Sequence, residues 1–139
     1  MKAIPDDPGR RGVVGIVLRQ QRMLVIRRSQ TVVAPLFRCF PGGGIEANES
    51  EQEALVREFR EELSLTIRPV RRVWRCVTPW KVELAWWLAR LPPDAVPVPN
   101  PDEVDSVDWM TPGEMGRLPD LLESNREFLA LLACGTIRL

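Results

Sequence analysis

Alternating apolar positions and short polar breaks predict that much of this chain forms a β-sheet. Residues 12–19 and 23–28 are rich in β-branched side chains, and the polar turn between them predicts a β-hairpin. Gly15, inside the first strand, indicates a bulge or the close approach of another segment. Further strands are expected at 65–78, 80–91 and 104–110. The break at Thr78 and Pro79 indicates that the strands on either side of it run antiparallel.

A helix is expected after the glycine-rich residues 42–44. Ser50, followed three residues later by Glu53, reads as a capping box and fixes where this helix starts. Residues three and four apart share a helix face, so an apolar stripe can anchor the helix to a core. That stripe consists of Leu55, Phe59 and Leu63.

The last third of the chain predicts a loop followed by two helices. Residues 92–103 are rich in proline and read as an extended loop. Thr111 and Glu114, with a proline in the first turn between them, form a helix start. A second helix is expected at about 119–133, where leucines can pack on the sheet, and Gly135 closes it.

Four tryptophans gather in the region 65–91, where they can serve the core or a ligand. A nucleobase could stack on such aromatic side chains, but core packing is the simpler interpretation for most of them. Trp86 and Trp87 are adjacent in a predicted strand, so their side chains point to opposite faces.

Three carboxylates within one helical turn mark the candidate chemistry. Glu58, Glu61 and Glu62 share one face of the predicted helix, where they repel one another. A cation among them would relieve this repulsion, and oxygen ligands without His or Cys favour Mg²⁺, with Mn²⁺ as a substitute. The glycines at 42–44 let the backbone approach a bound phosphate or the metal closely. The alternative interpretation is an acidic helix face exposed to water.

Composition narrows these possibilities. Histidine and tyrosine are absent, so a side-chain proton acceptor must be a carboxylate, Lys or Cys. The formal net charge is zero, which gives no reason to expect nucleic acid or a membrane surface as a partner. The three cysteines are odd in number and far apart, which argues against a disulfide framework and fits a reducing cytosol.

The length of the chain favours one domain. A chain of 139 residues is expected to be a single domain, 1–139, with 1–11 as a flexible lead-in. We find no apolar run long enough to span a bilayer and no signal peptide, so we expect a cytoplasmic protein.

Residues 43–65 resemble the Nudix box. The family pattern is Gly, five residues, Glu, seven residues, then Arg-Glu-apolar-any-Glu-Glu-any-Gly-apolar. Gly43, Glu49 and the run 57–65 match every specified position except one. The exception is Ser64, where the family has a glycine that commonly ends the helix in a left-handed conformation. Serine adopts that conformation at a modest cost, and the carboxylates are unaffected.

The resemblance implies an α/β fold, the Nudix α/β/α sandwich with a mixed β-sheet, and a Mg²⁺-dependent hydrolase of a nucleoside diphosphate linked to another group. The implied metal ligands are Glu58, Glu61, Glu62 and the backbone carbonyl of Gly42. Gly43 and Gly44 are expected beside the bound substrate, and Arg57 is expected to brace the loop by pairing with Glu49. The general base is Glu61, Glu62 or Glu103. The family often has an extra carboxylate in this region as metal ligand or base, and Glu103 is the candidate for it; a solvated acidic loop is the other interpretation of Glu103.

The spacing between the pair Arg27-Arg28 and residues 40–43 resembles the MutT-like branch of the family. By that resemblance Arg28 is a candidate for contacting substrate phosphate, as guanidinium geometry allows, and Arg27 is read as a solvated strand end. In MutT-like enzymes an Asn at the start of the terminal helix reads the purine edge, and Asn125 stands in a comparable setting. A solvent-facing side chain is the simpler interpretation of Asn125.

The expected substrate is therefore a small-molecule nucleotide. The MutT-like resemblance favours a nucleoside triphosphate, cleaved to the monophosphate and pyrophosphate. Nucleotide sugars and dinucleoside polyphosphates are alternatives within the family, and a non-catalytic nucleotide-binding module is an alternative from another class. Nudix enzymes often dimerise, so the resemblance allows a homodimer, although nothing in the sequence marks an interface.

Overall fold

The computed structural model describes residues 10–139, which form seven strands and three helices. In chain order they are β1 (Arg11–Arg19), β2 (Arg22–Arg28), β3 (Arg38–Cys39), β4 (Gly42–Gly44), α1 (Glu51–Leu63), β5 (Arg68–Val77), β6 (Glu83–Arg90), β7 (Val104–Met110), α2 (Pro112–Gly116) and α3 (Glu123–Ala133). Residues 1–9 of the predicted lead-in lie outside the described residues, and Arg11 already belongs to β1. None of the helices in the described chain has the length and apolar character that a bilayer crossing needs.

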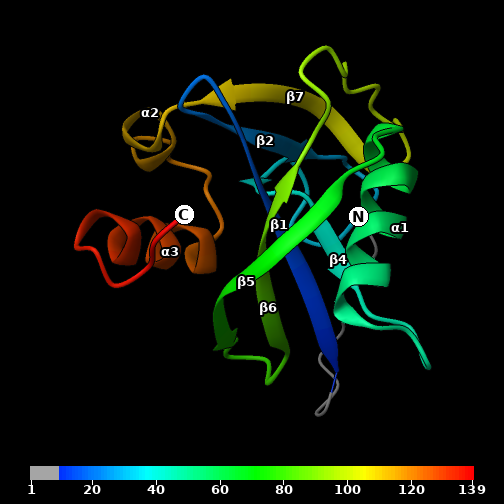
Figure 1. Ribbon diagram of the computed structural model, residues 1–139, viewed down its shortest axis with the longest axis horizontal. Coiled ribbons are helices and arrows are strands. Elements are labelled where there is room, and N and C mark those ends of the chain that lie inside the picture. Colours follow the sequence, from blue (N-terminus) through cyan, green and yellow to red (C-terminus); the bar gives the residue numbers. More distant parts are fainter. Residues whose placement is uncertain (1–9) are drawn as a thin grey trace.

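Strand β1 is the centre of the mixed sheet (Figure 1). It pairs in parallel with β6 and antiparallel with β2 and β4. The strand order is β3-β2-β1-β6-β5, and β7 adds to β2. The antiparallel pairing of β5 with β6 confirms the prediction for those strands. The β1–β2 hairpin is confirmed as well, and its turn residues Gln20 and Gln21 have the positive φ values that suit a tight hairpin turn.

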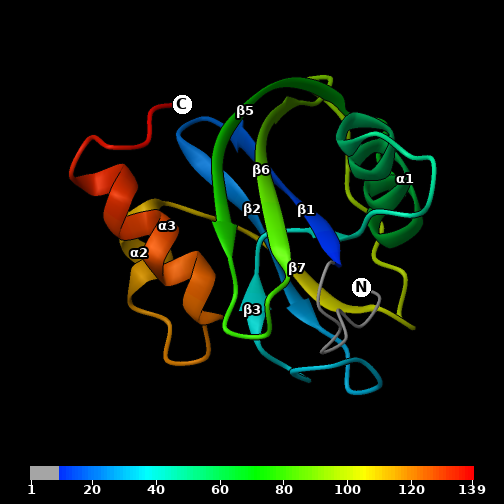
Figure 2. The same cartoon turned by 90° about the horizontal axis from the view of Figure 1, so that it is seen from below.

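Helices cover both faces of the sheet, which confirms the α/β/α sandwich. Helix α1 lies on one side of the strands, and α2 and α3 lie on the other (Figure 2). Each side has its own apolar core, one around Phe59 of α1 and one around Phe128 of α3. Trp87 belongs to the first core and Trp86 to the second, so the predicted opposite orientations and core packing are both confirmed. Trp80 differs from these, because it is 61% exposed.

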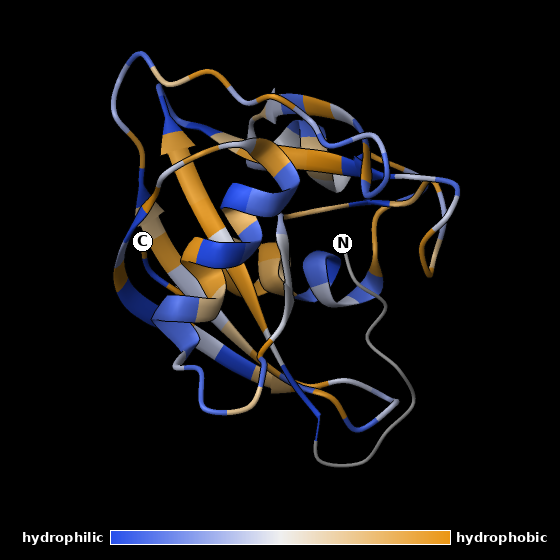
Figure 3. Ribbon diagram, turned by 90° about the vertical axis from the view of Figure 1, so that its right-hand side faces the viewer, coloured by the Kyte–Doolittle hydropathy of each residue, from blue (hydrophilic) through white to orange (hydrophobic). Residues whose placement is uncertain are grey.

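Local capping signals explain where α1 begins and ends. The capping box between Ser50 and Glu53 is present, and Ser64 ends the helix in the left-handed conformation at φ 54°. In Figure 3 the exposed side of α1 is hydrophilic and the strands behind it are mostly hydrophobic. Phe59 explains Gly15, because a Cβ at that position would overlap the Phe59 ring. Gly15 therefore marks a close approach of α1 to β1.

The second predicted helix begins later than expected. We expected it to start at about residue 119, but α3 starts at Glu123. The preceding residues form an extended segment instead: Asp120 accepts a hydrogen bond from the backbone of Arg38, and Leu122 donates one back to it. This pairing with β3 joins segments far apart in the chain, and the helical apolar pattern does not report it. At the other end, Gly135 has a positive φ of 83° and follows the helix as predicted.

Candidate active site

Three carboxylates from two distant segments meet beside α1. Glu58 and Glu61 lie one turn apart on α1, and Glu103 immediately precedes β7. One carboxylate oxygen from each lies within 4.8 Å of the others. A cluster of carboxylate oxygens without nitrogen or sulfur ligands suits a hard cation such as Mg²⁺. The structure therefore brings three of the four predicted catalytic carboxylates together.

One oxygen of the Glu58 carboxylate is placed as a metal ligand would be. Its side chain is fully buried, and burial raises its pKa to about 7, although the guanidinium of Arg57 opposes this shift. Oε1 accepts a hydrogen bond from Arg57, and Oε2 has no hydrogen-bond partner among residues 10–139. Because a buried oxygen without a partner is costly, the Oε2 atom fits a metal ligand.

Glu62, the fourth predicted carboxylate, lies outside this group of three and faces β4. It is fully buried, and its Oε1 accepts a hydrogen bond of 3.2 Å from the backbone N–H of Gly42. Burial raises the pKa of Glu62 to about 8. Glu62 therefore joins the acidic helix to the glycine-rich strand, at the same end of the site as Glu58.

The glycines of β4 lie directly against these carboxylates. The α-carbon of Gly43 faces the carboxylate of Glu58 so closely that a side chain would not fit between them. A Cβ on Gly44 would meet open space, and its carbonyl accepts a hydrogen bond of 2.8 Å from Arg57. Gly43 thus allows the close approach, and Gly44 contributes a backbone oxygen.

Arg57 braces the loop after β4 against α1, as the resemblance implied. Its Nε and Nη2 atoms donate to the two carboxylate oxygens of Glu49, at 2.7 and 2.9 Å. Its Nη1 atom donates to Glu58 at 2.8 Å and to Glu61 at 3.4 Å. The hydrogen bond with Glu49 raises the pKa of Arg57, so its charge is permanent. One guanidinium therefore orients the loop and two members of the carboxylate cluster.

Asn125 is buried, so the expectation of a solvent-facing side chain is wrong. It is 3% exposed, and its Oδ1 accepts a hydrogen bond of 2.9 Å from the backbone of Phe40. Asn125 lies in the first turn of α3, and this hydrogen bond ties it to the chain between β3 and β4. It lines a cavity of about 50 Å³ together with Gly42 and Gly43. The candidate base-reading residue and the candidate phosphate-side glycines thus border one cavity.

The two arginines at the end of β2 are placed differently from expectation. Arg27 is half-buried and its Nε donates to the carbonyl of Leu36, so it is not a freely solvated strand end. Arg28 is 2% exposed, and its Nε donates to the carbonyl of Val33 at 2.7 Å. Its Nη1 is buried and has no hydrogen-bond partner among the described residues. Both side chains hold the loop that follows β2.

Sequence reasoning missed a second charged cluster at the first turn of α1. Glu51 is 7% exposed and accepts a hydrogen bond of 2.7 Å from the indole of Trp87. Its carboxylate also accepts hydrogen bonds from Arg11, Arg72 and Arg75. Burial opposes its ionisation, but the bonds from Trp87 and Arg72 prevail and lower its pKa. Nothing local in the sequence signals this cluster, because its partners come from three strands.

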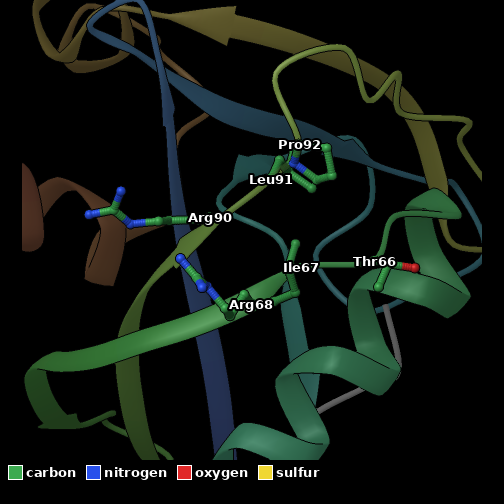
Figure 4. A pocket seen from close by; sticks show the side chains of 6 residues that line it. All are labelled: Thr66, Ile67, Arg68, Arg90, Leu91 and Pro92. Atoms are coloured by element: carbon green, nitrogen blue, oxygen red, sulfur yellow. The ribbon is translucent and has the colours of Figure 1, made fainter.

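A larger cleft lies away from the carboxylates. It measures about 360 Å³ and lies where β5 begins and β6 ends. Figure 4 shows the side chains that line it, which come from residues 66–68 and 90–92. None of the predicted site residues is among them. A still larger cleft, of about 500 Å³, runs along α1 and is lined by Arg57 and Glu61, so the cleft at residues 66–68 and 90–92 is not favoured by its size.

Comparison with known proteins identifies the family of the chain. The family model described as NUDIX domain matches residues 9–132. A curated relative from Deinococcus radiodurans, named Nudix hydrolase, is 33% identical over 76 residues, which are 51% of this chain and 43% of the relative. This chain thus aligns with less than half of the length of that relative.

Solved structures share the fold. A MutT protein from Methanosarcina mazei Go1 superposes with a TM-score of 0.80 at 18% identity, over 95% of this chain and 98% of that one. An ADP-ribose pyrophosphatase from Streptococcus suis 89-1591 superposes with a TM-score of 0.72 at 19% identity, over 91% of each chain. At these identities the likeness shows the fold. Since the family model spans most of the sequence, the chain belongs to the NUDIX domain family, that of the Nudix hydrolases.

Proposed function

We propose that this chain is a Mg²⁺-dependent hydrolase that cleaves a diphosphate linkage in a nucleoside diphosphate linked to another group. The observation that carries the proposal is the convergence of Glu58, Glu61 and Glu103 within 4.8 Å, beside the glycines of β4. Mn²⁺, which also takes oxygen ligands, is the expected substitute.

The reaction is the attack of water on phosphorus. The water oxygen forms a bond to one phosphorus, the bond from that phosphorus to the bridging oxygen breaks, and the water proton passes to a base. Bound Mg²⁺ would shield the phosphate charge and lower the pKa of water. Glu58, Glu61 and Glu62 are the proposed ligands, with the backbone carbonyl of Gly42, and Glu103 is a further metal ligand or the base.

Burial separates the candidate bases. Glu62 is fully buried, and its Oε1 accepts a hydrogen bond from the backbone N–H of Gly42, so Glu62 is the least accessible of the candidate bases to an incoming water. Glu61 is 39% exposed at its side chain, and Glu103 is half-buried. Because both are more accessible to water than Glu62, we favour Glu61 or Glu103 as the base.

Within this activity we propose a MutT-like preference for nucleoside triphosphates, which yields a monophosphate and pyrophosphate. Asn125 and Gly43 line one cavity, which supports a base and phosphates bound close together beside β4. That cavity is smaller than the ~300 Å³ of a small ligand pocket, so the base must widen it or stack at its mouth. Arg28 enters the proposal through its buried Nη1, a cationic donor with no hydrogen-bond partner among the described residues.

The test measures pyrophosphate and phosphate release from a panel of nucleoside triphosphates, nucleotide sugars and dinucleoside polyphosphates in the presence of Mg²⁺. Wild-type protein is compared with Glu62→Gln and with Glu127→Gln, a matched control whose carboxylate is exposed on α3. We expect pyrophosphate from at least one triphosphate, a loss of roughly 100-fold or more in Glu62→Gln, and wild-type rates in the control.

Each other result changes the proposal in a defined way. Cleavage restricted to sugar-linked or dinucleoside substrates would keep the hydrolase and overturn the triphosphate preference. Equal rates in Glu62→Gln and wild type would remove Glu62 from the metal site. No turnover with any substrate, in protein that binds nucleotide, would replace the hydrolase with a binding module.

A further inference from the structure

Asn100 lies in the Pro-rich loop between β6 and β7, where it contacts the C-terminal end of α1. Its backbone N–H donates to the carbonyl of Glu62 at 2.8 Å, and its side-chain Nδ2 donates to the carbonyl of Glu61 at 3.4 Å. The last carbonyls of a helix have no partner within the helix. Asn100 therefore caps the two residues of α1 that carry neighbouring carboxylates of the site.

The same residue shapes the turn that leads to Glu103. Its backbone carbonyl accepts hydrogen bonds from the N–H groups of Glu103 at 3.0 Å and Val104 at 2.8 Å. Its side-chain Oδ1 accepts a hydrogen bond of 3.1 Å from the N–H of Asp102. An Asn side chain that bonds the backbone two residues later defines a local turn. Asn100 thus bonds α1 on one side and the Glu103 segment on the other.

The loop after β2 holds the opposite side of that segment. Ser29, which is 4% exposed, donates its backbone N–H to the carbonyl of Glu103 and its hydroxyl to the carbonyl of Asp102, both at 3.1 Å. Thr31 donates its hydroxyl to the same Asp102 carbonyl at 3.0 Å. The backbone at Asp102 and Glu103 is therefore fixed from two directions.

Such fixation matters because the carboxylates of the cluster repel one another. Glu58, Glu61 and Glu103 lie within 4.8 Å, and like charges at this separation favour a displaced Glu103 unless the backbone resists. Helix α1 is anchored by its apolar face. Glu103 lies in the loop between β6 and β7, so its backbone needs separate hydrogen bonds to keep it in place beside the helix.

We propose that Asn100 is a positioning residue that holds Glu103 in register with the carboxylates of α1. The inference rests on the proposed metal-dependent function and adds a residue that neither the box nor the metal-ligand chemistry identifies. Asn100 touches neither substrate nor metal in this role. It acts through the placement of Glu103, and its loss weakens the cluster as a cation site.

The first experiment titrates Mn²⁺ directly into protein without substrate, by electron paramagnetic resonance of the free ion. We expect Asn100→Ala to weaken Mn²⁺ binding by roughly tenfold to hundredfold, the range for residues that orient metal ligands. Asn100→Ser, whose hydroxyl can still accept from the N–H of Asp102, should recover most of the affinity. Asp94→Ala is the matched control, because Asp94 is exposed in the same loop.

The second experiment is a double-mutant cycle with Glu103→Gln. If Asn100 acts through Glu103, then Asn100→Ala should add little to the loss of Mn²⁺ affinity that Glu103→Gln already causes. Additive losses would overturn the assignment, as would an unchanged affinity in Asn100→Ala. Asn100→Gln, which keeps the amide but displaces it, replaces the alanine variant if that variant does not fold.

These outcomes separate the inference from the function on which it rests. Wild-type protein that binds no Mn²⁺ would overturn the proposed metal-dependent hydrolase. Wild-type protein that binds Mn²⁺, with Asn100→Ala binding equally well, would leave the hydrolase standing and overturn only the role of Asn100.

Discussion

A methyl group on the α-carbon of Gly43 would overlap the carboxylate of Glu58, because it would lie closer to the carboxylate carbon than van der Waals contact allows. The Glu58 side chain cannot easily move aside, because it is fully buried and its Oε1 accepts a hydrogen bond from Arg57. Strand β4 and helix α1 are therefore packed closely together at the carboxylate of Glu58, a proposed metal ligand.

We therefore predict that Gly43→Ala displaces Glu58 and weakens Mg²⁺-dependent activity by about tenfold or more. The matched control is Gly44→Ala, because a Cβ at Gly44 meets open space and the substitution keeps the carbonyl that bonds Arg57. The measurement is kcat/KM together with Mn²⁺ affinity for both variants. Equal losses in the two would show that the contact with Glu58 is unimportant.

Replacing Arg57 by Lys should destabilise the fold as well as the site. Lysine cannot donate to both oxygens of Glu49 and to the Gly44 carbonyl at once. We expect a loss of about 1–3 kcal/mol in the free energy of unfolding, measured by urea denaturation without metal. Arg60→Lys, at an exposed position of the same helix, should change it little. A stability equal to wild type in Arg57→Lys would contradict the bracing role.

The raised pKa values of Glu58 and Glu62 predict how stability depends on pH. Their pKa values of about 7 and about 8 lie above the ordinary 4.5, so the folded protein binds protons more tightly than the unfolded chain. Without metal, the free energy of unfolding should fall as the pH rises from the ordinary pKa of 4.5 to the raised pKa of about 8.

Mg²⁺ should oppose this loss of stability at high pH, because a cation competes with protons for the same carboxylates. We expect the rise in Tm caused by Mg²⁺ to be larger at about pH 8.5 than at about pH 6, as thermal melts would show. In the double variant Glu58→Gln, Glu62→Gln the pH dependence should flatten. A Mg²⁺ effect that does not vary with pH would contradict the assignment of these two groups.

Ser64 offers a test of the helix end at which the chain departs from the Nudix box. Its φ of 54° is costly for any residue with a Cβ. Ser64→Gly should therefore raise the free energy of unfolding by about 0.5 kcal/mol, the relief of strain minus the added entropy of the unfolded chain. Ser64→Ala keeps the strain and should show no gain. Urea denaturation of the two variants decides between them.

Local signals in the sequence predicted the elements that carry most of the site. The capping box at Ser50 and the left-handed Ser64 were recognisable because they depend on neighbouring residues, and they set both ends of α1. The alternating pattern placed β7 at its observed bounds, with Glu103 next to it. The acidic helix and the positions of its carboxylates therefore followed from the sequence.

Contacts between distant segments explain what the sequence did not show. The late start of α3 depends on pairing with Arg38, and the burial of Asn125 depends on a hydrogen bond to Phe40. Glu51, on α1, accepts a hydrogen bond from Trp87 on β6. Asn100 lies in the loop that the prolines predicted, but its link to α1 follows from the fold.

The parallel pairing of β1 with β6 joins the two halves of the chain and affects how the protein folds. During synthesis α1 is complete before β6 and β7 exist, so its acidic face stays in water until the second half arrives. Pairings between such distant segments make folding slow. The carboxylate cluster also forms late, because Glu103 must join α1. A cation that binds the finished cluster should therefore slow unfolding and leave the folding rate almost unchanged.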